Sequence, residues 1–329
     1  MASGSPLMDN RRLVSESNGV QTERVAYFRG KIVPESQVLI SFRDSSAIHG
    51  EGVYDTARTF DGRIFKLGEH LDRLWRSMRY LRIEPPVSFQ ELEEISNEVA
   101  RRNVAICNQD VWVTQRVSPG APREFGGDGI PTLIVECLPL PFAMRSQYFK
   151  TGISMQTPSV RRTPPWALSP QAKTVNYLNF IVAGREIAAI RPGAWPILLD
   201  EHGNLTEGGG ANIFLVHDKT LSTPRTQYVL PGITRSTVIE LAISRDFTVV
   251  ERDIGMFEAI QADEIFLTAT SLCVCPVSDI NGHTPASNQI PGPVTGQLQH
   301  AFSALVGIDV VGQYLDLIGT VPPTPPFTG

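Results

Sequence analysis

The chain has 329 residues, of which 42% are hydrophobic and 19% charged, and its formal net charge is −5. This balance is typical of a soluble globular enzyme and excludes the basic surface that nucleic-acid binding requires. No apolar run approaches the ~20 residues of a membrane span. Segment 1–23 is polar throughout and lacks the hydrophobic stretch of a secretory signal, so we expect a cytoplasmic protein. The length predicts one or two domains.

The first half of the chain predicts a small α/β domain over 25–140, preceded by a disordered tail over 1–24. Apolar residues recur at intervals of three and four over 68–82 and 88–103, which predicts two helices. Strand-like runs are found at 25–28, 31–33, 53–60, 63–66, 111–116 and 132–138. The segment between the last two strands is rich in Pro and Gly, so we expect a loop there.

The second half predicts a larger domain over 149–310, joined to the first by a linker over 141–148. Strand-like runs are found at 197–199, 213–216, 247–251 and 264–268. Helices are expected around 177–189, 235–244 and 292–305. The proline-rich end of the chain predicts a flexible tail over 311–329.

The four cysteines are predicted to be buried thiols and not a disulfide framework or a metal site. Cys107 and Cys137 are isolated, and each lies beside apolar residues. Cys273 and Cys275 alternate along a predicted strand, so their side chains share a face. Because no histidine or second cysteine pair stands nearby, the residues of a metal centre are not complete.

Three short blocks supply the residue types of one chemistry. The first holds a lone lysine, Lys173, and the second holds a carboxylate, Glu207, before three glycines. The third, Leu230-Pro-Gly-Ile-Thr, indicates a loop that enters a helix, whose first N–H groups can bind a phosphate. A lysine that forms a Schiff base, a carboxylate beside the ring nitrogen and a phosphate cradle are what pyridoxal 5'-phosphate (PLP) requires. The sequence therefore predicts a PLP enzyme.

In this order the blocks resemble the signature of the class IV, or fold-type IV, PLP-dependent aminotransferases. The resemblance continues upstream through His49-Gly-Glu-Gly-Val-Tyr54-Asp-Thr-Ala-Arg58 and downstream through Ala262–Ser271, and it covers the chain from about 25 to about 305. It implies an α/β fold like that of D-amino acid aminotransferase, with an α+β small domain and a larger α/β domain. The family includes branched-chain amino acid, D-amino acid and (R)-amine transaminases.

The resemblance also implies which residues bind the cofactor. Lys173 matches the Schiff-base lysine, which in the family also moves the proton between substrate and cofactor. Glu207 matches the carboxylate on the pyridine nitrogen, and Arg73 matches the phosphate-binding arginine. The other matches to cofactor contacts are Tyr177 at the ring hydroxyl and Ile233, Thr234 and Thr270 at the phosphate.

The sequence indicates the substrate class less specifically than it indicates the cofactor. Substrate contacts are expected from His49, Tyr54, Arg58, Arg123, Ala269 and Ser271. Arg58 and Tyr177 favour the branched-chain branch, whereas Val160-Arg-Arg-Thr-Pro-Pro resembles the (R)-amine transaminases. Arg123 lies in the loop where D-amino acid and (R)-amine enzymes carry a carboxylate-binding arginine, a task that suits its planar fork. Ala47, however, replaces a tyrosine of the D-amino acid enzymes.

We expect ping-pong transamination, in which an amino acid or primary amine gives its amino group to a 2-keto acid by way of pyridoxamine phosphate. Thr56-Ala-Arg58 is also similar to the matching strand of aminodeoxychorismate lyase, so a PLP lyase is a further alternative. The resemblance implies a homodimer whose pockets are completed by a loop of the partner. Neither a nucleic acid nor a membrane is expected as a partner.

Overall fold

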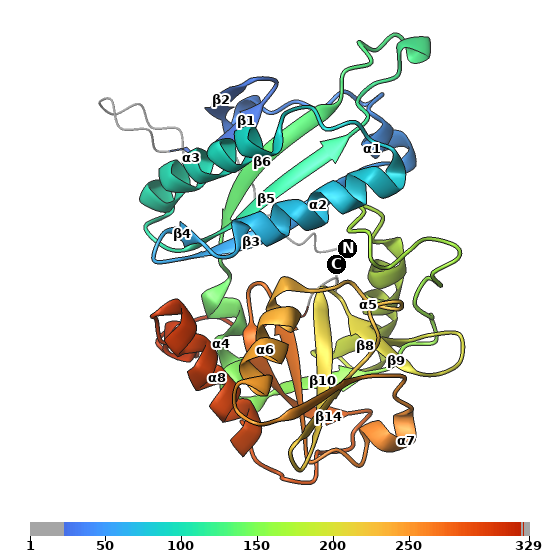
Figure 1. The fold of residues 1–329 in the computed structure, drawn as a ribbon, viewed down its shortest axis with the longest axis vertical. Coiled ribbons are helices and arrows are strands. Elements are labelled where there is room, and N and C mark those ends of the chain that lie inside the picture. Colours follow the sequence, from blue (N-terminus) through green and yellow to red (C-terminus); the bar gives the residue numbers. More distant parts are fainter. Residues whose placement is uncertain (1–22, 324, 326–329) are drawn as a thin grey trace, which may run out of the picture.

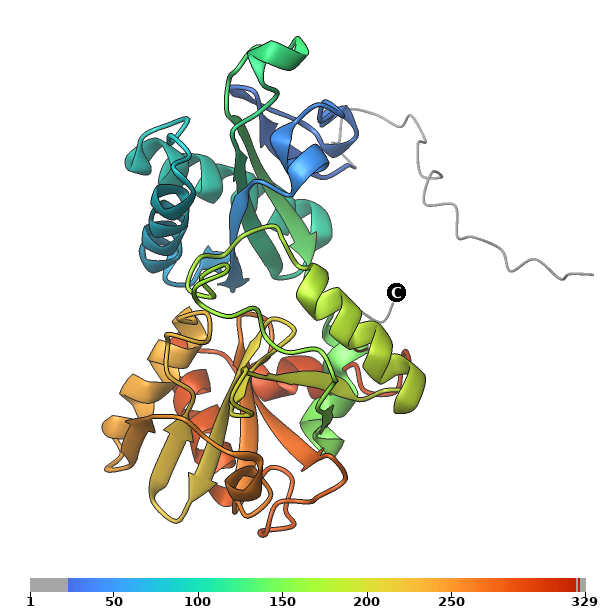
Figure 2. The ribbon, with the colours of Figure 1, turned by 90° about the vertical axis from the view of Figure 1, so that its right-hand side faces the viewer.

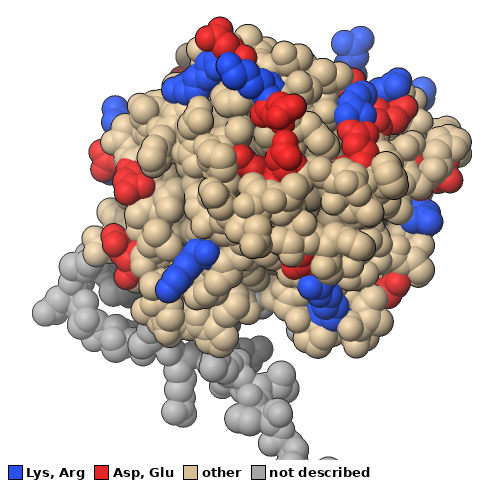
Figure 3. Space-filling view, turned by 90° about the horizontal axis from the view of Figure 1, so that it is seen from below, with Lys and Arg blue, Asp and Glu red and all other residues tan. Residues whose placement is uncertain are grey.

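The computed structural model describes residues 23–323 and Pro325, which form two β-sheets with helices packed on them, one unit above the other (Figure 1). The tail predicted over 1–24 lies outside the described residues except for its last two. Among the described residues, no helix is both long and apolar enough to cross a membrane. The face seen from below carries positive and negative side chains interspersed, with much of the surface uncharged (Figure 3).

The upper sheet has six strands in the order β2-β1-β6-β5-β3-β4, and all of its pairs are antiparallel. The strands are β1 (Val25–Phe28), β2 (Lys31–Pro34), β3 (Val53–Phe60), β4 (Arg63–Ile64), β5 (Val111–Ser118) and β6 (Thr132–Pro139). Its helices are η1 (Glu35–Gln37), α1 (Ser45–His49), α2 (Leu67–Leu81), α3 (Phe89–Cys107) and η2 (Arg123–Phe125). In Figure 1, α2 and α3 lie together in front of this sheet.

Local sequence explains why α2 and α3 form. Ser88 and Glu91 make a capping box, in which each side chain accepts a hydrogen bond from the backbone N–H of the other. On α2, Leu71, Leu74 and Met78 recur at three and four and are buried against the sheet. Each such side chain contributes about 1.5–3 kcal/mol when it is fully buried. Both predicted helices are therefore observed, with ends shifted by a few residues.

The lower sheet has eight strands in the order β12-β11-β10-β13-β14-β7-β8-β9. Because β9 pairs with β10 as well as with β8, the strands from β10 to β9 close into a ring. The strands are β7 (Ile153–Gln156), β8 (Trp195–Leu199), β9 (Leu205–Gly208), β10 (Ala211–His217), β11 (Thr220–Thr223), β12 (Thr248–Glu251), β13 (Glu264–Ala269) and β14 (Cys273–Ile280). The helices are α4 (Phe142–Thr151), α5 (Leu178–Ile190), α6 (Ile233–Ile243), α7 (Met256–Ala259), α8 (Pro293–Val306) and α9 (Val310–Leu315).

The core of the lower unit fills this ring and the space under its helices. Phe214 of β10 and Phe266 of β13 stack with their ring centroids 5.0 Å apart, and both are fully buried. Cys273 and Cys275 belong to the same core, and all four cysteines are free thiols. Figure 2 shows α5 at the junction of the two units, on the side where the chain crosses between them.

Two segments depart from the sequence prediction. The linker expected over 141–148 forms most of α4, whose Phe142, Tyr148 and Phe149 are buried. The tail expected from 311 begins with α9 instead, and Tyr314 of α9 is fully buried. Tyr314 stacks on Phe149 with the ring centroids 4.2 Å apart. The two helices thus order each other through a contact that neither segment reveals by itself.

We expect that Tyr314→Ala lowers the free energy of unfolding by about 3–5 kcal/mol, because a large buried aromatic side chain is replaced by a cavity. Urea unfolding followed by fluorescence would measure the change. Leu315→Ala is the matched control, since Leu315 lies on the same helix but is 38% exposed, and it should cost less than about 1 kcal/mol. Equal effects of the two substitutions would show that α9 is not anchored through Tyr314.

Candidate active site

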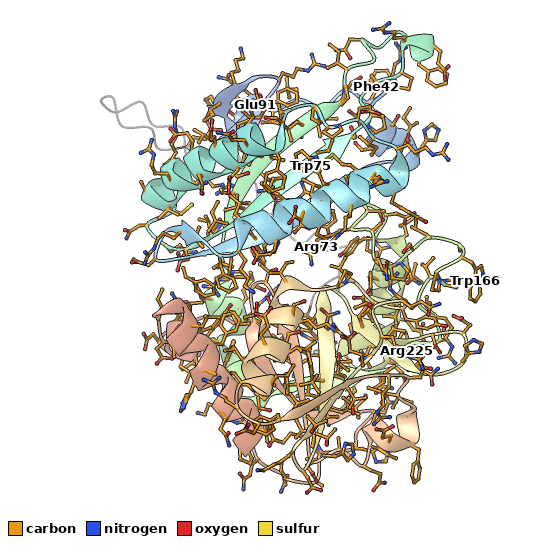
Figure 4. All side chains as sticks on the ribbon, viewed as in Figure 1. Phe42, Arg73, Trp75, Glu91, Trp166 and Arg225 are labelled. Atoms are coloured by element: carbon orange, nitrogen blue, oxygen red, sulfur yellow. The ribbon has the colours of Figure 1, made fainter. Side chains whose placement is uncertain are left out.

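A cavity of about 460 Å³ lies where the two units meet. Its walls come from α2, β3, β5 and β6 of the upper unit and from α4, α5, β8, β9, β10, β13 and the start of α6 in the lower unit. Arg73 points from α2 toward the lower unit (Figure 4). The cavity contains the amine, the carboxylate and the helix start that the sequence singled out, so the predicted blocks converge on one place.

Lys173 is held between two tyrosines. Its Nζ lies 3.4 Å from the hydroxyl of Tyr54 and 3.3 Å from that of Tyr177. The lysine backbone is pinned to the upper unit, because Tyr54 N donates to Lys173 O at 3.0 Å and Lys173 N donates to Ser77 Oγ at 3.0 Å. The pinned backbone and the tyrosine pair place the amine in the cavity.

Arg73 is fixed by a buried carboxylate. Its Nε and Nη2 donate to the two oxygens of Asp55 at 2.7 and 2.8 Å, a bidentate arrangement. Nη1 of Arg73 donates to Pro231 O of the lower unit at 3.0 Å. Burial alone would raise the pKa of Asp55, but the charge of Arg73 and the hydrogen bonds from Arg73 and His70 hold it well below its usual range. Asp55 is therefore ionised and Arg73 keeps a fixed orientation.

His70 completes this cluster. Its Nδ1 lies 2.7 Å from Asp55 Oδ1, and its side chain is almost entirely buried. Burial and the nearby cations Arg73 and Lys173 lower the pKa of His70, although Asp55 opposes this shift. The imidazole is thus neutral near pH 7, and its Nδ1–H donates to the carboxylate.

The start of α6 forms an anion cradle. Gly232, Ile233 and Thr234 line the cavity, and no side chain of the described residues caps the first N–H groups of this helix. These N–H groups have no partner within the helix and carry the positive end of its dipole. A Cβ at Gly232 would clash with Asn212 Oδ1, so a side chain there would displace the Asn212 amide. Thr270 lines the same cavity and donates its hydroxyl to Thr56 O at 3.2 Å.

Glu207 is buried and its two oxygens are both occupied. Oε1 accepts from Arg162 Nε at 3.1 Å, and Oε2 accepts from Leu230 N at 3.0 Å and weakly from Asn212 Nδ2 at 3.4 Å. Burial raises the pKa of Glu207, and the charge of Arg162 counters that rise. Arg162 itself is held over the ring of Phe180 at 4.7 Å. The Arg162 pairing was not predicted, because it joins residues 45 positions apart in sequence.

This donor set fits PLP. A lysine amine, a carboxylate held by hydrogen bonds, a free helix start and a fixed arginine are brought into one cavity. They match the aldehyde, the ring nitrogen and the phosphate of that cofactor. The residues predicted as cofactor contacts all line the cavity: Arg73, Lys173, Tyr177, Glu207, Ile233, Thr234 and Thr270.

The predicted substrate residues divide into two groups. Tyr54, Ala269 and Ser271 line the cavity. His49 is the last residue of α1, and Arg123 lies on η2, where its Nε donates to Asp128 O at 3.1 Å. Both are exposed and lie outside the cavity of this chain.

Arg58 is also outside the cavity, contrary to the expected substrate contact. It is buried, and its guanidinium donates to Ser271 O at 3.2 Å and to Gln313 Oε1 at 3.1 Å. Its guanidinium carbon lies 4.0 Å from the centroid of the Phe60 ring. Arg58 therefore supports the turn at Ser271 from behind, because all of its donors face packed protein.

One wall of the cavity was not predicted from the sequence. Trp112, Thr114 and Arg116 alternate along β5, and they pair with Arg58, Thr56 and Tyr54 of β3. Alternate residues of a strand share a face, so this wall could have been inferred once Tyr54 was placed in the site. Nothing in the sequence marked three further lining residues of α4, β6 and β8, which are Arg145, Leu138 and Trp195.

Comparison with known proteins gives the family context of this site. The model of the class IV amino-transferase family matches residues 52–280. A protein of Methanocaldococcus jannaschii, provisionally named a branched-chain-amino-acid aminotransferase, is 35% identical over 284 residues, which are 84% of this chain and 94% of the relative. A D-alanine aminotransferase of Bacillus licheniformis is 29% identical over 278 residues, 83% of this chain and 94% of the relative.

Solved structures are similar over nearly the whole fold. The branched-chain amino acid aminotransferase of Escherichia coli superposes with a TM-score of 0.79 at 27% identity, and the match covers 86% of this chain and 95% of that one. A second enzyme of the same name, from T.th., was solved with pyridoxamine 5'-phosphate. It superposes with a TM-score of 0.78 at 27% identity, over 87% of this chain and 95% of that one.

Asp55→Asn is expected to lower the free energy of unfolding by about 3–5 kcal/mol at pH 7, because it leaves Arg73 buried without its counter-charge. The pKa of Asp55 is depressed in the folded chain, so the stability it contributes is fully present above its unfolded pKa, near 4, and is lost as the pH falls through and below that value. The difference in free energy of unfolding between wild type and variant should thus decrease by about 1 kcal/mol from pH 5 to pH 3.

Urea unfolding of wild type and Asp55→Asn at both pH values measures this difference in free energy. Asp72→Asn removes an exposed carboxylate from α2, the helix that carries Arg73, and should leave stability within about 0.5 kcal/mol of wild type. If Asp55→Asn behaved like this control, the ion pair would not stabilise the fold.

Proposed function

The chain belongs to the class IV aminotransferases, a PLP-dependent family, and from that premise we propose that its amino donors are branched-chain L-amino acids and its acceptors are 2-keto acids. It is a PLP-dependent transaminase most similar to the branched-chain-amino-acid aminotransferases. The donor proposal rests on the apolar part of the cavity wall, which is made by Trp112, Leu138, Trp195, Ala269 and Leu272. Such a wall favours a branched aliphatic side chain.

We assign the cofactor contacts to residues that line the cavity. When bound, PLP supplies an electron sink for the charge left on the amino-bearing carbon after its proton is removed. Glu207 would hold the ring nitrogen, and Arg162 keeps that carboxylate oriented through its bond to Oε1. Arg73 and the N–H groups of Ile233 and Thr234 would hold the phosphate, with Thr270 beside them.

Lys173 is the proposed acid–base residue. Its Nζ removes the proton from the amino-bearing carbon of the donor and later returns a proton to complete the transfer. The hydroxyls of Tyr54 and Tyr177 lie within 3.4 Å of Nζ and hold it in place. Because the lysine backbone is bonded to both β3 and α2, the amine moves only by rotating its side chain. The keto acid then accepts the amino group by the same steps in reverse order, which makes the reaction ping-pong.

The turn at Ala269 and Ser271 is the proposed seat of the substrate carboxylate. Its position is fixed from behind, because the carbonyl of Ser271 accepts from Arg58 Nη1 and from the hydroxyl of Tyr314. Thr270 is tied to β3 through Thr56 O. A rigid turn of this kind orients the donor so that its amino-bearing carbon faces Lys173.

Half-reactions with single donors test the donor class. We expect L-leucine to convert the bound cofactor to its amine form at least about tenfold faster than D-alanine or (R)-1-phenylethylamine, which corresponds to about 1.4 kcal/mol of transition-state discrimination. The absorbance change of the cofactor, followed by stopped flow, gives the rates. The D-alanine aminotransferase among the relatives makes D-alanine the informative competitor.

Lys173→Ala provides the control for these half-reactions. It should bind PLP, as measured by cofactor released on denaturation, yet convert at least about 100-fold more slowly with every donor. A faster reaction with D-alanine or the (R)-amine would overturn the donor proposal. Turnover without any keto acid would instead favour a lyase.

We also propose that the chain acts as a homodimer. Leu39 and Phe42 are 76% and 79% exposed on the segment before α1, and Phe42 is labelled at the upper edge in Figure 4. The loop with Arg123 is attached to the start of α1, which follows this segment, because Ser45 N donates to Gly120 O at 2.9 Å. A partner covering this edge would bury the side chains of Leu39 and Phe42. It would also bring His49 and Arg123 of this chain toward the cavity of the partner.

Light scattering of the eluted protein is expected to give twice the chain mass of 36.2 kDa. Phe42→Glu should shift the protein toward the monomer, because it would bury an unpaired charge in the interface. Phe257→Glu is the matched control: Phe257 is equally exposed, at 79%, but lies on α7. A monomeric wild type, or the same shift with both variants, would contradict this interface.

A further inference from the structure

A second cavity, of about 330 Å³, lies in the upper unit and shares no lining residue with the candidate active site. Its walls are the turn between β1 and β2, the loop between α2 and α3, the end of the loop that carries Arg123, and the start of β6. Figure 1 shows β1 and β2 in the upper part of this unit, away from the junction with the lower unit. The volume lies within the range of ~300–1,000 Å³ that is typical of small-molecule pockets.

The floor of this cavity is apolar. Tyr27 of β1, Val87 and Leu133 of β6 line it, and all three pack on the core between the sheet and α2 and α3. Ile130 lines it too and is 62% exposed, so a ligand side chain on this floor would remove apolar surface from water. Each methylene buried in this way strengthens binding about fourfold.

Two opposite charges stand beside the apolar floor. Arg29 and Asp128 are the charged residues among the described residues that line the cavity. Nη2 of Arg29 lies 3.5 Å from Oδ2 of Asp128, and the two side chains are 62% and 43% exposed. An exposed ion pair at this distance contributes little to stability, so a ligand can separate its two members at small cost.

The local backbone fixes where the two charges lie. Arg29 and Gly30 have φ angles of 49° and 86°, as in the tight two-residue turn of a β-hairpin. Oδ1 of Asp128 accepts from Ile130 N at 3.1 Å, which leaves Oδ2 beside Arg29. The carbonyl of Asp128 accepts from Arg123 Nε at 3.1 Å. The cation, the carboxylate and the floor therefore keep one arrangement.

We propose that this second cavity binds a free α-amino acid with an apolar side chain. The carboxylate of the ligand pairs with the guanidinium of Arg29, whose planar fork suits that group. The ammonium group pairs with Oδ2 of Asp128, and the side chain lies on the floor made by Tyr27, Val87 and Leu133. An α-amino acid carries both charges on one carbon, and it therefore replaces the Arg29–Asp128 pair without leaving either charge alone.

Calorimetry on the borohydride-reduced holoenzyme tests this site. In that form Lys173 is joined permanently to the cofactor, so an amino acid cannot react in the active site. L-Leucine should bind, and Arg29→Met and Asp128→Asn should each weaken this binding at least about tenfold, because one charge-assisted pair is lost. Binding of L-leucine that stays unchanged in both variants, or no binding at all, would overturn the proposal.

Three smaller ligands separate the parts of the site. 4-Methylvaleric acid lacks the ammonium group, 3-methylbutylamine lacks the carboxylate, and glycine lacks the side chain. Each should bind at least about tenfold more weakly than L-leucine. If 4-methylvaleric acid bound as tightly as L-leucine, the cavity would recognise an apolar acid and the assignment to an amino acid would be wrong.

Arg82→Met is the matched control for Arg29→Met. Arg82 is also exposed, has a similar φ of 56° and lies outside the cavity. It should leave the binding of L-leucine within about twofold of wild type. Equal losses in Arg82→Met and Arg29→Met would show that a general change of surface charge weakens binding, and the site would be disproved.

Ile130→Asp tests the floor without touching the ion pair. It places a charge where the side chain of the ligand would lie and should weaken binding of L-leucine at least about tenfold. Unchanged binding in this variant would contradict the proposed position of the ligand. Because the reduced protein does not turn over, these measurements hold whether or not L-leucine is a donor in the active site.

Discussion

The buried pair of Arg73 with Asp55 is the interaction on which the site depends. It joins α2 to β3 within the upper unit, and the same guanidinium donates to Pro231 O at the entrance of α6 in the lower unit. A buried charge pair is stable only when its geometry is fixed and its remaining donors are satisfied. The remaining donor of Arg73 is satisfied by Pro231 O of the lower unit, so the pair also fixes how the two units meet. The cradle at the start of α6 and the lysine held by β3 are positioned relative to each other by this link.

A second set of contacts holds the opposite wall. The carbonyl of Ser271 accepts from Arg58 and from Tyr314, and its hydroxyl accepts from Arg145. Arg58 also bonds Gln313 of α9, so the C-terminal helix is part of the support for the site. Residues that serve this turn come from β3, α4 and α9, and its rigidity therefore depends on the packing of the whole junction between the units.

Much of the fold followed from local signals. Apolar repeats at three and four predicted both long helices of the upper unit, because this signal acts within one or two turns. The helices α4 and α9 were not predicted. Each is ordered by stacking of Phe149 on Tyr314, and that contact joins segments far apart in the chain. Residue patterns within either segment carry no sign of it.

The sequence by itself determined the chemistry: Lys173, Glu207 and the loop before Ile233 identify an amine, a carboxylate and an anion cradle, because these functional groups do not depend on their neighbours. Only the tertiary structure decided what each charged side chain faces. It placed Arg58 behind the site as a support, paired Arg162 with Glu207 and left Arg145 with no ion pair to any described carboxylate. The physical reason is that the cost or benefit of a charge is set by desolvation and by partners within a few ångströms, and folding alone brings those partners together.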